Sequence, residues 1–320
     1  MNKLIPTILL TIILAACTAA PTPVVESTAT PLPPTATAFV LPSATVELRL
    51  PPATAPAVTE LVPTPTASNL RTSPIDGMPQ VYIPAGTFRM GGMDARSAPD
   101  ERPAHYVTLD AYWMDQLEVT NAMYILCLQS GSCTPPQSLK SAHRLEYFNN
   151  PEFKDYPVIY VTWAQARTYC EWAGGHLPTE AQWERAARGD DWRTFPWGED
   201  KADDLRANFN MLVGDTSRVG TYPLGASPFG ILDMAGNVAE WTNDYYSGTY
   251  YNSQADAVNP TGPASSASLK RVVRGGSLGD AEINIRVAKR SAVAGSNVDI
   301  VPVTPGDFSP RIGFRCAQDK

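Results

Sequence analysis

An abrupt change of composition near residue 77 divides this chain of 320 residues into two unlike parts. Residues 18–77 hold 12 of the 30 prolines, are rich in threonine and alanine, and contain no tryptophan, tyrosine or cysteine. So few large apolar side chains cannot bury enough surface to offset the conformational entropy of folding. We therefore expect residues 17–77 to form a disordered, semi-extended spacer. Residues 78–320 are long enough for one sizeable core and form the predicted folded domain.

The first 16 residues have the features of a secretory signal. Lys3 precedes an apolar run from Leu4 to Leu14 that is too short to span a bilayer as a stable helix. The sequence Leu14-Ala-Ala-Cys17 resembles the lipobox of bacterial lipoproteins, in which the cysteine becomes the lipid-modified first residue. The alternative is an ordinary signal peptide with an incidental Cys17. We predict an exported protein that is tethered to a membrane by a lipid anchor and faces outside the cytoplasm.

Charge, cysteines and histidines exclude several kinds of partner and site. The predicted domain carries 22 basic and 28 acidic side chains, a net charge of −6, and no basic run, so we expect no nucleic-acid partner. Its four cysteines are an even number that suits an oxidising compartment: Cys127, Cys133, Cys170 and Cys316. The first two are close enough in sequence for a small loop disulfide. Three scattered histidines argue against a zinc or iron site: His105, His143 and His176.

The strand patterns are short and are concentrated at the start of the domain. Residues 81–92 predict two strands that are separated by a turn at Pro84-Ala-Gly86. Residues 106–114 alternate apolar with polar side chains and predict one further strand. From Phe195 onward the chain consists of short strands and loops that are rich in glycine, proline and asparagine.

Three helices have clear starts. Thr120 can cap a helix over residues 121–127. Thr162-Trp-Ala-Gln165 and Thr179-Glu-Ala-Gln182 are capping boxes, and the second helix that they begin ends at Gly189. Few helices among many short strands and loops predict an α+β fold.

The loop Asp233-Met-Ala-Gly-Asn-Val-Ala-Glu-Trp241 offers oxygen ligands and little else. Two carboxylates, an amide and carbonyls at a sharp turn suit a hard cation such as Ca²⁺. The alternative is a loop that is held by Asx-type hydrogen bonds from Asp233 and Asn237, with Trp241 in the core. Spacing alone favours this alternative, because two carboxylates in one loop are a weak metal signal.

Taken together, eight motifs in order resemble the formylglycine-generating enzyme, or sulfatase-modifying factor, family. They are Ile83-Pro-Ala-Gly-Thr-Phe-Arg-Met-Gly91, Glu118-Val-Thr-Asn121, Pro157-Val-Ile-Tyr-Val-Thr-Trp163, Leu177-Pro-Thr-Glu-Ala-Gln-Trp-Glu-Arg-Ala-Ala-Arg-Gly189, Phe195-Pro-Trp-Gly198, Asp233-Met-Ala-Gly-Asn-Val238, Arg274-Gly-Gly-Ser277 and Ile312-Gly-Phe-Arg-Cys316. The resemblance covers residues 78–317. It implies a compact, loop-rich fold that is related to the C-type lectin fold.

The resemblance also implies a disulfide and structural Ca²⁺. Cys170 and Cys316 stand where family members form a long-range disulfide. One Ca²⁺ site of the family matches Asp233, the carbonyls of Gly236 and Val238, and Glu240, which reverses the interpretation from spacing alone. A second site matches Asn208, the carbonyl of Phe209 and, less directly, Asp215.

The catalytic residues of the family are missing. Its copper-dependent oxygenase activity needs two cysteines shortly after the Gly-Gly-Ser motif, because Cu(I) binds soft thiolates. Residues 278–289 contain no cysteine, methionine or histidine, and Ala239 replaces a tryptophan that many members carry. Asp280, Glu282 and Asn284 could hold a hard metal, although a polar surface strand is the more common explanation. We therefore expect no copper site and no formylglycine-generating activity.

The sequence leaves three hypotheses for function. The first is a surface-displayed binding module that holds a protein or glycan with the loops between Leu278 and Pro310. The second is a formylglycine-generating-type oxidoreductase that modifies an exported protein such as a sulfatase. The third is a scaffold that assists a catalytic paralogue, and it leaves the same trace in the sequence as the first.

Overall fold

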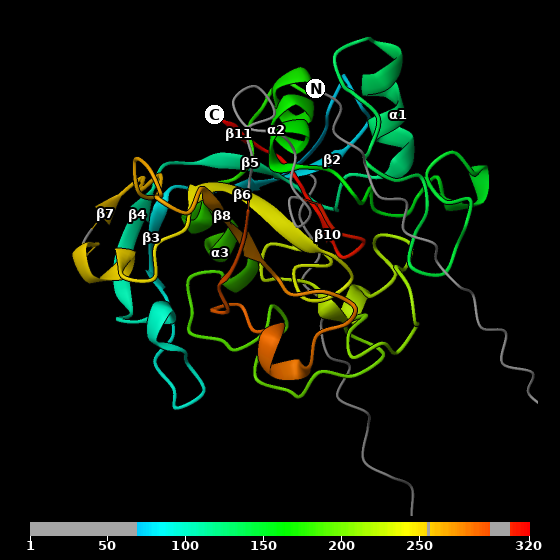
Figure 1. Cartoon of the computed structure of the whole chain (residues 1–320). Helices are drawn as coiled ribbons and strands as arrows, with labels where there is room; N and C mark the ends of the chain where they lie inside the picture. Colours follow the sequence, from blue (N-terminus) through cyan, green and yellow to red (C-terminus); the bar gives the residue numbers. More distant parts are fainter. Residues whose placement is uncertain (1–68, 255–256, 295–307) are drawn as a thin grey trace, which may run out of the picture. The chain divides into compact units, whose positions relative to one another are not determined.

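The computed structural model describes residues 69–254, 257–294 and 308–320 (Figure 1). The predicted signal peptide, most of the predicted spacer and the predicted lipidation site Cys17 lie outside these residues. Within the described part, no helix combines the length and apolar character that crossing a membrane requires.

Three small sheets form the framework. The first is antiparallel, in the order β1-β2-β5-β11, with bounds Leu70–Thr72, Pro79–Ile83, Tyr112–Asp115 and Ala317–Asp319. The second has the order β10-β6-β8-β9, with bounds Ile312–Gly313, Ala239–Tyr245, Lys270–Arg274 and Ser291–Ala294. The third has the order β3-β4-β7, with bounds Gly86–Met90, His105–Leu109 and Ala257–Val258. In the second sheet β10 runs parallel to β6, and in the third β7 runs parallel to β4.

Three α-helices pack against these sheets: α1 (Asn121–Gln129), α2 (Trp163–Trp172) and α3 (Glu180–Arg188). The predicted cap at Thr120 and both predicted capping boxes are present. Five 3₁₀ turns connect the described elements: η2 (Pro99–Glu101), η3 (Pro151–Phe153), η4 (Pro223–Gly225), η5 (Tyr250–Ser253) and η6 (Glu282–Asn284). In Figure 1, α1 and α2 lie beside the first sheet, whereas α3 lies inside the fold and contacts β3, β4, β6 and β8.

The prediction of one strand over residues 106–114 is wrong. The chain forms β4 up to Leu109, turns at Asp110 and Ala111, and begins β5 at Tyr112 in a different sheet. Buried and less buried side chains alternate within each strand, with Val107 and Leu109 buried in β4 and Tyr112 and Met114 buried in β5, and the two less buried residues of the turn separate the two runs. A period of two therefore indicates strand conformation here but cannot show that the sheet changes.

The first strand lies earlier than composition suggests. β1 pairs with β2 although it belongs to the stretch that we assigned to the spacer. Asp76 in the same stretch accepts a hydrogen bond from the Tyr169 hydroxyl at 2.7 Å. A strand of three residues is too short to produce a periodic pattern, so the ordered sheet includes residues that composition alone places outside it.

Both disulfides are confirmed. Cys127 and Cys133 close a small loop at the end of α1, with an S–S distance of 1.99 Å. Cys170 in α2 is bonded to Cys316, just before β11, with a Cα–Cα distance of 5.5 Å. The second disulfide joins residues that are 146 positions apart and links a helix to the first sheet.

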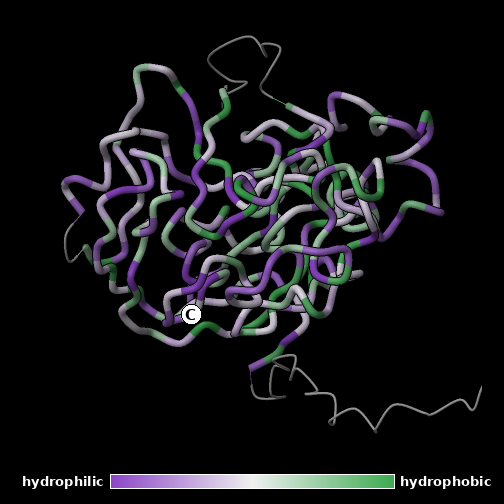
Figure 2. Tube along the Cα trace, turned by 90° about the horizontal axis from the view of Figure 1, so that it is seen from below, coloured by the Kyte–Doolittle hydropathy of each residue, from purple (hydrophilic) through white to green (hydrophobic). Residues whose placement is uncertain are grey.

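Charged side chains are part of the interior. Every residue of α3 is buried, including two glutamates and two arginines. Arg274 of β8 forms ion pairs with Glu180 and Glu184, and Arg290 forms a second pair with Glu180 at 2.7 Å. Figure 2 shows hydrophilic stretches of chain among the apolar ones inside the fold. Such pairs keep buried charges compensated, because an unpaired charge in the interior is very costly.

Candidate functional site

The loop before β6 has a strained backbone that its sequence makes possible. Asp233, Gly236 and Asn237 have φ values of 57°, 83° and 53°, in the left-handed region that glycine and asparagine tolerate best. A Cβ atom at Gly236 would lie 2.4 Å from the carbonyl oxygen of Asn208, so no larger residue fits without displacement of that backbone.

Asn237 joins this loop to its neighbours. Its side-chain oxygen accepts from the Ser217 amide at 2.8 Å, and its side-chain nitrogen donates to Glu118 at 2.5 Å. The backbone amide of Asn237 donates to the Asn208 carbonyl at 2.7 Å. Hydrogen bonds from Asn237 therefore hold the loop, but they run to distant segments of the chain and are not the local Asx-type bonds of the alternative interpretation.

Three carboxylates are buried beside this loop. Glu118, Asp233 and Glu240 are 0%, 6% and 0% exposed. Burial raises the pKa of Glu118 well above its ordinary value, and the negative charges of Asp233 and Glu240 raise it further. Burial likewise raises the pKa of Asp233 to about 6. The positive charge of the Arg315 guanidinium acts in the opposite direction on the pKa of Glu118 and of Asp233.

Arg315 neutralises only one of these charges. Its guanidinium donates to both oxygens of Glu240 at 2.7 Å, and Trp183 Nε1 also donates to Glu240 at 2.7 Å. With all three acids ionised, three negative charges would face this single guanidinium. Among the described residues no three His, Cys, Asp or Glu side chains converge at a metal-binding spacing. A cation at this loop would therefore rely on backbone carbonyls together with the carboxylates, which is a donor set that suits Ca²⁺.

The second predicted set lies next to the first. Asn208 donates from its side chain to the carbonyl oxygen of Asp215 at 2.9 Å, while its own side-chain oxygen is buried without a hydrogen-bond partner among the described residues. The Asp215 carboxylate accepts from the Ser141 hydroxyl at 2.5 Å and forms an ion pair with Arg144 at 3.5 Å. Phe209 is buried beside them. The unpartnered oxygen of Asn208 is the feature of this set that fits a cation, because a buried acceptor without a donor is costly.

The segment that carries the catalytic cysteines in the family has a structural role here. The Asp280 carboxylate accepts from the amide and the hydroxyl of Ser277 at 2.8 and 2.7 Å, which closes the turn after the Gly-Gly-Ser motif. Glu282 and Asn284 lie in η6 and are partly exposed. Arg286 forms a buried ion pair with Glu101 at 3.0 Å.

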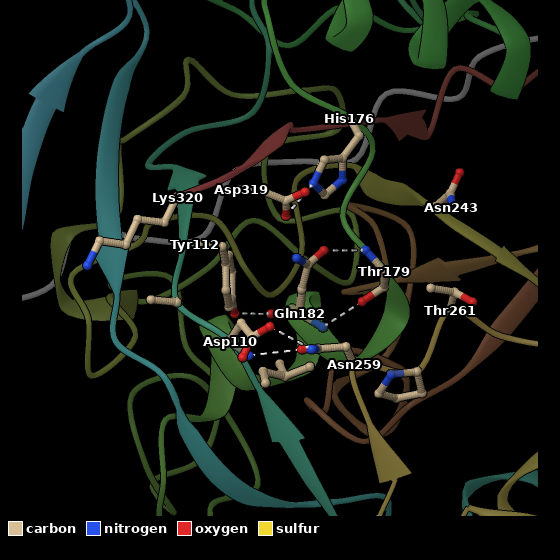
Figure 3. A pocket seen from close by; sticks show the side chains of 13 residues that line it. Asp110, Tyr112, His176, Thr179, Gln182, Asn243, Asn259, Thr261, Asp319 and Lys320 are labelled. Carbon is tan, nitrogen blue, oxygen red and sulfur yellow. Dashed lines mark hydrogen bonds and ion pairs between the residues drawn. The ribbon is translucent and has the colours of Figure 1, made fainter.

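A separate pocket of about 610 Å³ lies at the start of α3 (Figure 3). Five parts of the chain line it: the turn between β4 and β5, the start of α3 with the residues before it, β6, the residues after β7, and the end of β11. They contribute Leu109, Asp110, Ala111, Tyr112, His176, Thr179, Gln182, Asn243, Asn259, Pro260, Thr261, Asp319 and Lys320. No motif in the sequence indicates this pocket, because its residues come from distant segments of the chain.

Sequence analysis also gave no role to Glu118 or Arg315. Both stand within motifs that carry the resemblance, Glu118-Val-Thr-Asn121 and Ile312-Gly-Phe-Arg-Cys316. Each is a charged residue between apolar neighbours, which is the sequence feature that could have indicated their role. A charged residue that is buried needs a partner of opposite charge.

Comparison with known proteins identifies the family. A family model described as "Sulfatase-modifying factor enzyme 1-like domain" matches residues 66–320. The chain is 34% identical over 251 residues to the Chlamydia pneumoniae protein named serine/threonine-protein kinase pkn1, which covers 75% of this chain but 38% of the relative. It is 32% identical over 292 residues to the formylglycine-generating enzyme of Streptomyces coelicolor, covering 75% of this chain and 89% of that protein.

A solved structure, PvdO from Pseudomonas aeruginosa, has the same fold. It superimposes with a TM-score of 0.64 at 24% identity and covers 78% of this chain and 98% of its own. The loop-rich α+β fold that the resemblance implies is thereby confirmed. The chain belongs to the family of proteins with a sulfatase-modifying factor enzyme 1-like domain.

Proposed function

We propose that this chain is an exported, membrane-anchored member of the family that lacks formylglycine-generating activity and acts as a binding module for a protein or glycan. The observation that carries the proposal is the state of its cysteines. Four of the five form two disulfides, and the fifth, Cys17, is the predicted lipidation site.

The missing thiolates bear directly on the chemistry. Cu(I) prefers soft thiolate ligands, and the family's reaction uses two of them. Residues 278–289 supply none, and Asp280 in that segment is engaged with Ser277. What remains of the site can form a turn and hold its neighbours in place, but it offers no soft ligand.

We also propose that the loop before β6 binds structural Ca²⁺. Three buried carboxylates face one guanidinium, so a divalent cation would compensate the remaining charge. Asp233, Glu240 and the carbonyls of Gly236 and Val238 are the proposed ligands. At the second position the proposed ligands are the free side-chain oxygen of Asn208, the carbonyl of Phe209 and Asp215.

One observation favours the alternative of an active oxidoreductase. Relatives named formylglycine-generating enzyme match over most of their own length, 74% for that of Bos taurus and 89% for that of Streptomyces coelicolor. An active enzyme would need ligands that differ from those of the cysteine-containing members.

A turnover assay separates the two functions. The purified chain is incubated with a Cys-x-Pro-x-Arg peptide, O₂ and reductant, with Cu(I), Fe(II) or no added metal, and the peptide is analysed by mass spectrometry. The Streptomyces coelicolor enzyme serves as the positive control. We expect no conversion of the peptide cysteine by this chain while it remains folded by circular dichroism. Conversion to formylglycine with either metal would overturn the proposed function.

A further inference from the structure

We propose that the pocket in Figure 3 binds an uncharged saccharide through the free side-chain amide of Gln182. This inference rests on the proposed function, because it assigns a ligand class to the binding module. None of the described residues that line the pocket belongs to the loops between Leu278 and Pro310, where the sequence suggested that a partner would bind, and residues 295–307 of those loops lie outside the described part of the chain.

Hydrogen bonds between distant segments form the pocket walls before any ligand arrives. The Tyr112 hydroxyl donates to the carbonyl oxygen of Gln182 at 2.7 Å and fixes β5 against α3. Asn259 binds Asp110 twice, accepting from its amide at 2.9 Å and donating to its carboxylate at 2.8 Å. Asn259 has a φ of 44°, a conformation that asparagine tolerates better than most residues. A preformed site loses little conformational entropy on binding.

Gln182 provides the observation that points to a ligand. The side chain is 9% exposed, and its oxygen accepts from the Thr179 amide at 2.9 Å to complete the capping box. Its nitrogen has no hydrogen-bond partner among the residues that the structure describes, and in Figure 3 it lies on the side away from Thr179. Two N–H donors in a largely buried position thus face the pocket.

Other polar groups that line the pocket complete a mixed set of donors and acceptors. The side-chain amide of Asn243 and the Thr261 hydroxyl make no hydrogen bond with another described residue. Asp110 adds a carboxylate acceptor. A ligand that satisfies such a set must offer both donors and acceptors at short intervals, as adjacent hydroxyl groups do. Leu109, Ala111 and Pro260 provide apolar surface for the C–H groups of a sugar ring.

The charges around the pocket disfavour ionic ligands. The Lys320 ammonium extends over the Tyr82 ring, 5.7 Å from its centroid, and the His176 ring contacts Asp319 at 3.2 Å. A phosphate or carboxylate ligand beside Gln182 would therefore have the Lys320 ammonium directed away from it and the His176 ring next to a carboxylate (Figure 3). A cationic ligand would offer no acceptor to Gln182, and it would gain little from Asp110, which is exposed to solvent. The volume of about 610 Å³ lies in the usual range for ligand pockets and accommodates a mono- or disaccharide.

Isothermal titration of the full-length chain with a panel of uncharged saccharides tests this proposal. The panel contains glucose, galactose, mannose, N-acetylglucosamine and their common disaccharides, and inorganic phosphate and spermidine are the ionic probes. Gln182→Glu is the informative variant, because glutamate still accepts from Thr179 in a capping box but replaces the free donor by an oxygen. Gln129→Glu makes the same chemical change at an exposed position on α1, outside the pocket.

We expect at least one saccharide to bind, with an affinity that falls tenfold or more in Gln182→Glu and is unchanged in Gln129→Glu. Thr261→Val, which removes only a hydroxyl, should also weaken binding, and it replaces Gln182→Glu if that variant does not fold. Absence of binding by every saccharide, preference for phosphate or spermidine, or full affinity in the pocket variants overturns the inference. If no saccharide binds and the peptide is not converted, this inference fails but the proposed function stands. If the peptide is converted, the proposed function fails whether or not a saccharide binds.

Discussion

Glu240 and Arg315 form a completely buried ion pair with two hydrogen bonds of 2.7 Å between the guanidinium and the carboxylate. The pair joins β6 of the second sheet to the residue just before Cys316. The same guanidinium donates to the carbonyl oxygens of Asp115 and Leu232. One side chain thus ties four segments of the chain together.

Removal of this guanidinium should be strongly destabilising. We expect Arg315→Met to lower the free energy of unfolding by about 3–5 kcal/mol, because it leaves Glu240 buried without its counter-charge. Urea denaturation measures the change. Arg167→Met breaks an ion pair whose side chains are 52% exposed and should cost less than about 1 kcal/mol. Equal losses of unfolding free energy in Arg315→Met and Arg167→Met would contradict the prediction that a buried ion pair is the more costly one to break.

The two disulfides should contribute unequally to stability. In the chain-entropy model, a loop of about 147 residues contributes on the order of 5 kcal/mol and a loop of about 7 residues on the order of 2 kcal/mol. We therefore expect the double variant Cys170→Ala, Cys316→Ala to lose roughly twice as much unfolding free energy as Cys127→Ala, Cys133→Ala. The midpoints and slopes of urea denaturation provide the comparison. A larger loss from the small loop would show that local strain or packing outweighs chain entropy.

Calcium should stabilise the protein if the buried acids are its ligands. We expect millimolar Ca²⁺ to raise the melting temperature measured by circular dichroism, and chelation to lower it, because a cation bound only to the folded state shifts the folding equilibrium. Asp233→Asn should reduce this shift by half or more. Asp204→Asn, an exposed carboxylate, is the control and should leave it unchanged. No response of the wild type to Ca²⁺ would refute the proposed site.

Asp244 should make stability depend on pH. Burial, reinforced by the charge of Glu180, raises the pKa of Asp244 to about 8, whereas an aspartate in an unfolded chain has a pKa of about 3.9. Between these values the folded state holds a proton that the unfolded state has lost, so this residue's contribution to stability falls as the pH rises from about 4 to about 8.

The variant Asp244→Asn isolates this effect. An amide oxygen can still accept from the backbone amide of Glu180, which donates to Asp244 at 2.8 Å. We compare the unfolding free energy of the variant with that of the wild type at each pH. We expect this difference to favour the variant more at pH 8 than at pH 5, by at least about 1.4 kcal/mol, which is the free energy of one pKa unit. Urea denaturation at both pH values measures it, with Asp204→Asn as the exposed control. A difference that does not change with pH would refute the prediction.

Membrane attachment should depend on one side chain. In a bacterial host that processes lipoproteins, we expect the wild-type chain in the membrane fraction and Cys17→Ser in the soluble exported fraction. Fractionation followed by immunoblotting distinguishes them. Recovery of both proteins in the soluble fraction would favour the ordinary signal peptide.

Local signals predicted the helices well, and distant contacts limited the rest. The capping boxes at Thr162 and Thr179 involve partners three residues away, so the sequence displays them directly. Arg315 and Glu240 are 75 positions apart, and no local pattern shows that they meet. The pocket shows the same limit more clearly. The sequence identifies Gln182 as part of a capping box, but only the fold shows that its side-chain nitrogen lines a pocket.

The long-range disulfide and the last two strands set an order of events during synthesis. β10 completes the second sheet beside β6, β11 completes the first beside β5, and Cys316 lies between them. Neither sheet has all four of its strands, and the disulfide between Cys170 and Cys316 cannot form, until the ribosome has made nearly the whole domain. A ribosome that stalls shortly before residue 312 would therefore release a product that lacks an edge strand of each of these two sheets and the cysteine that joins α2 to the first sheet.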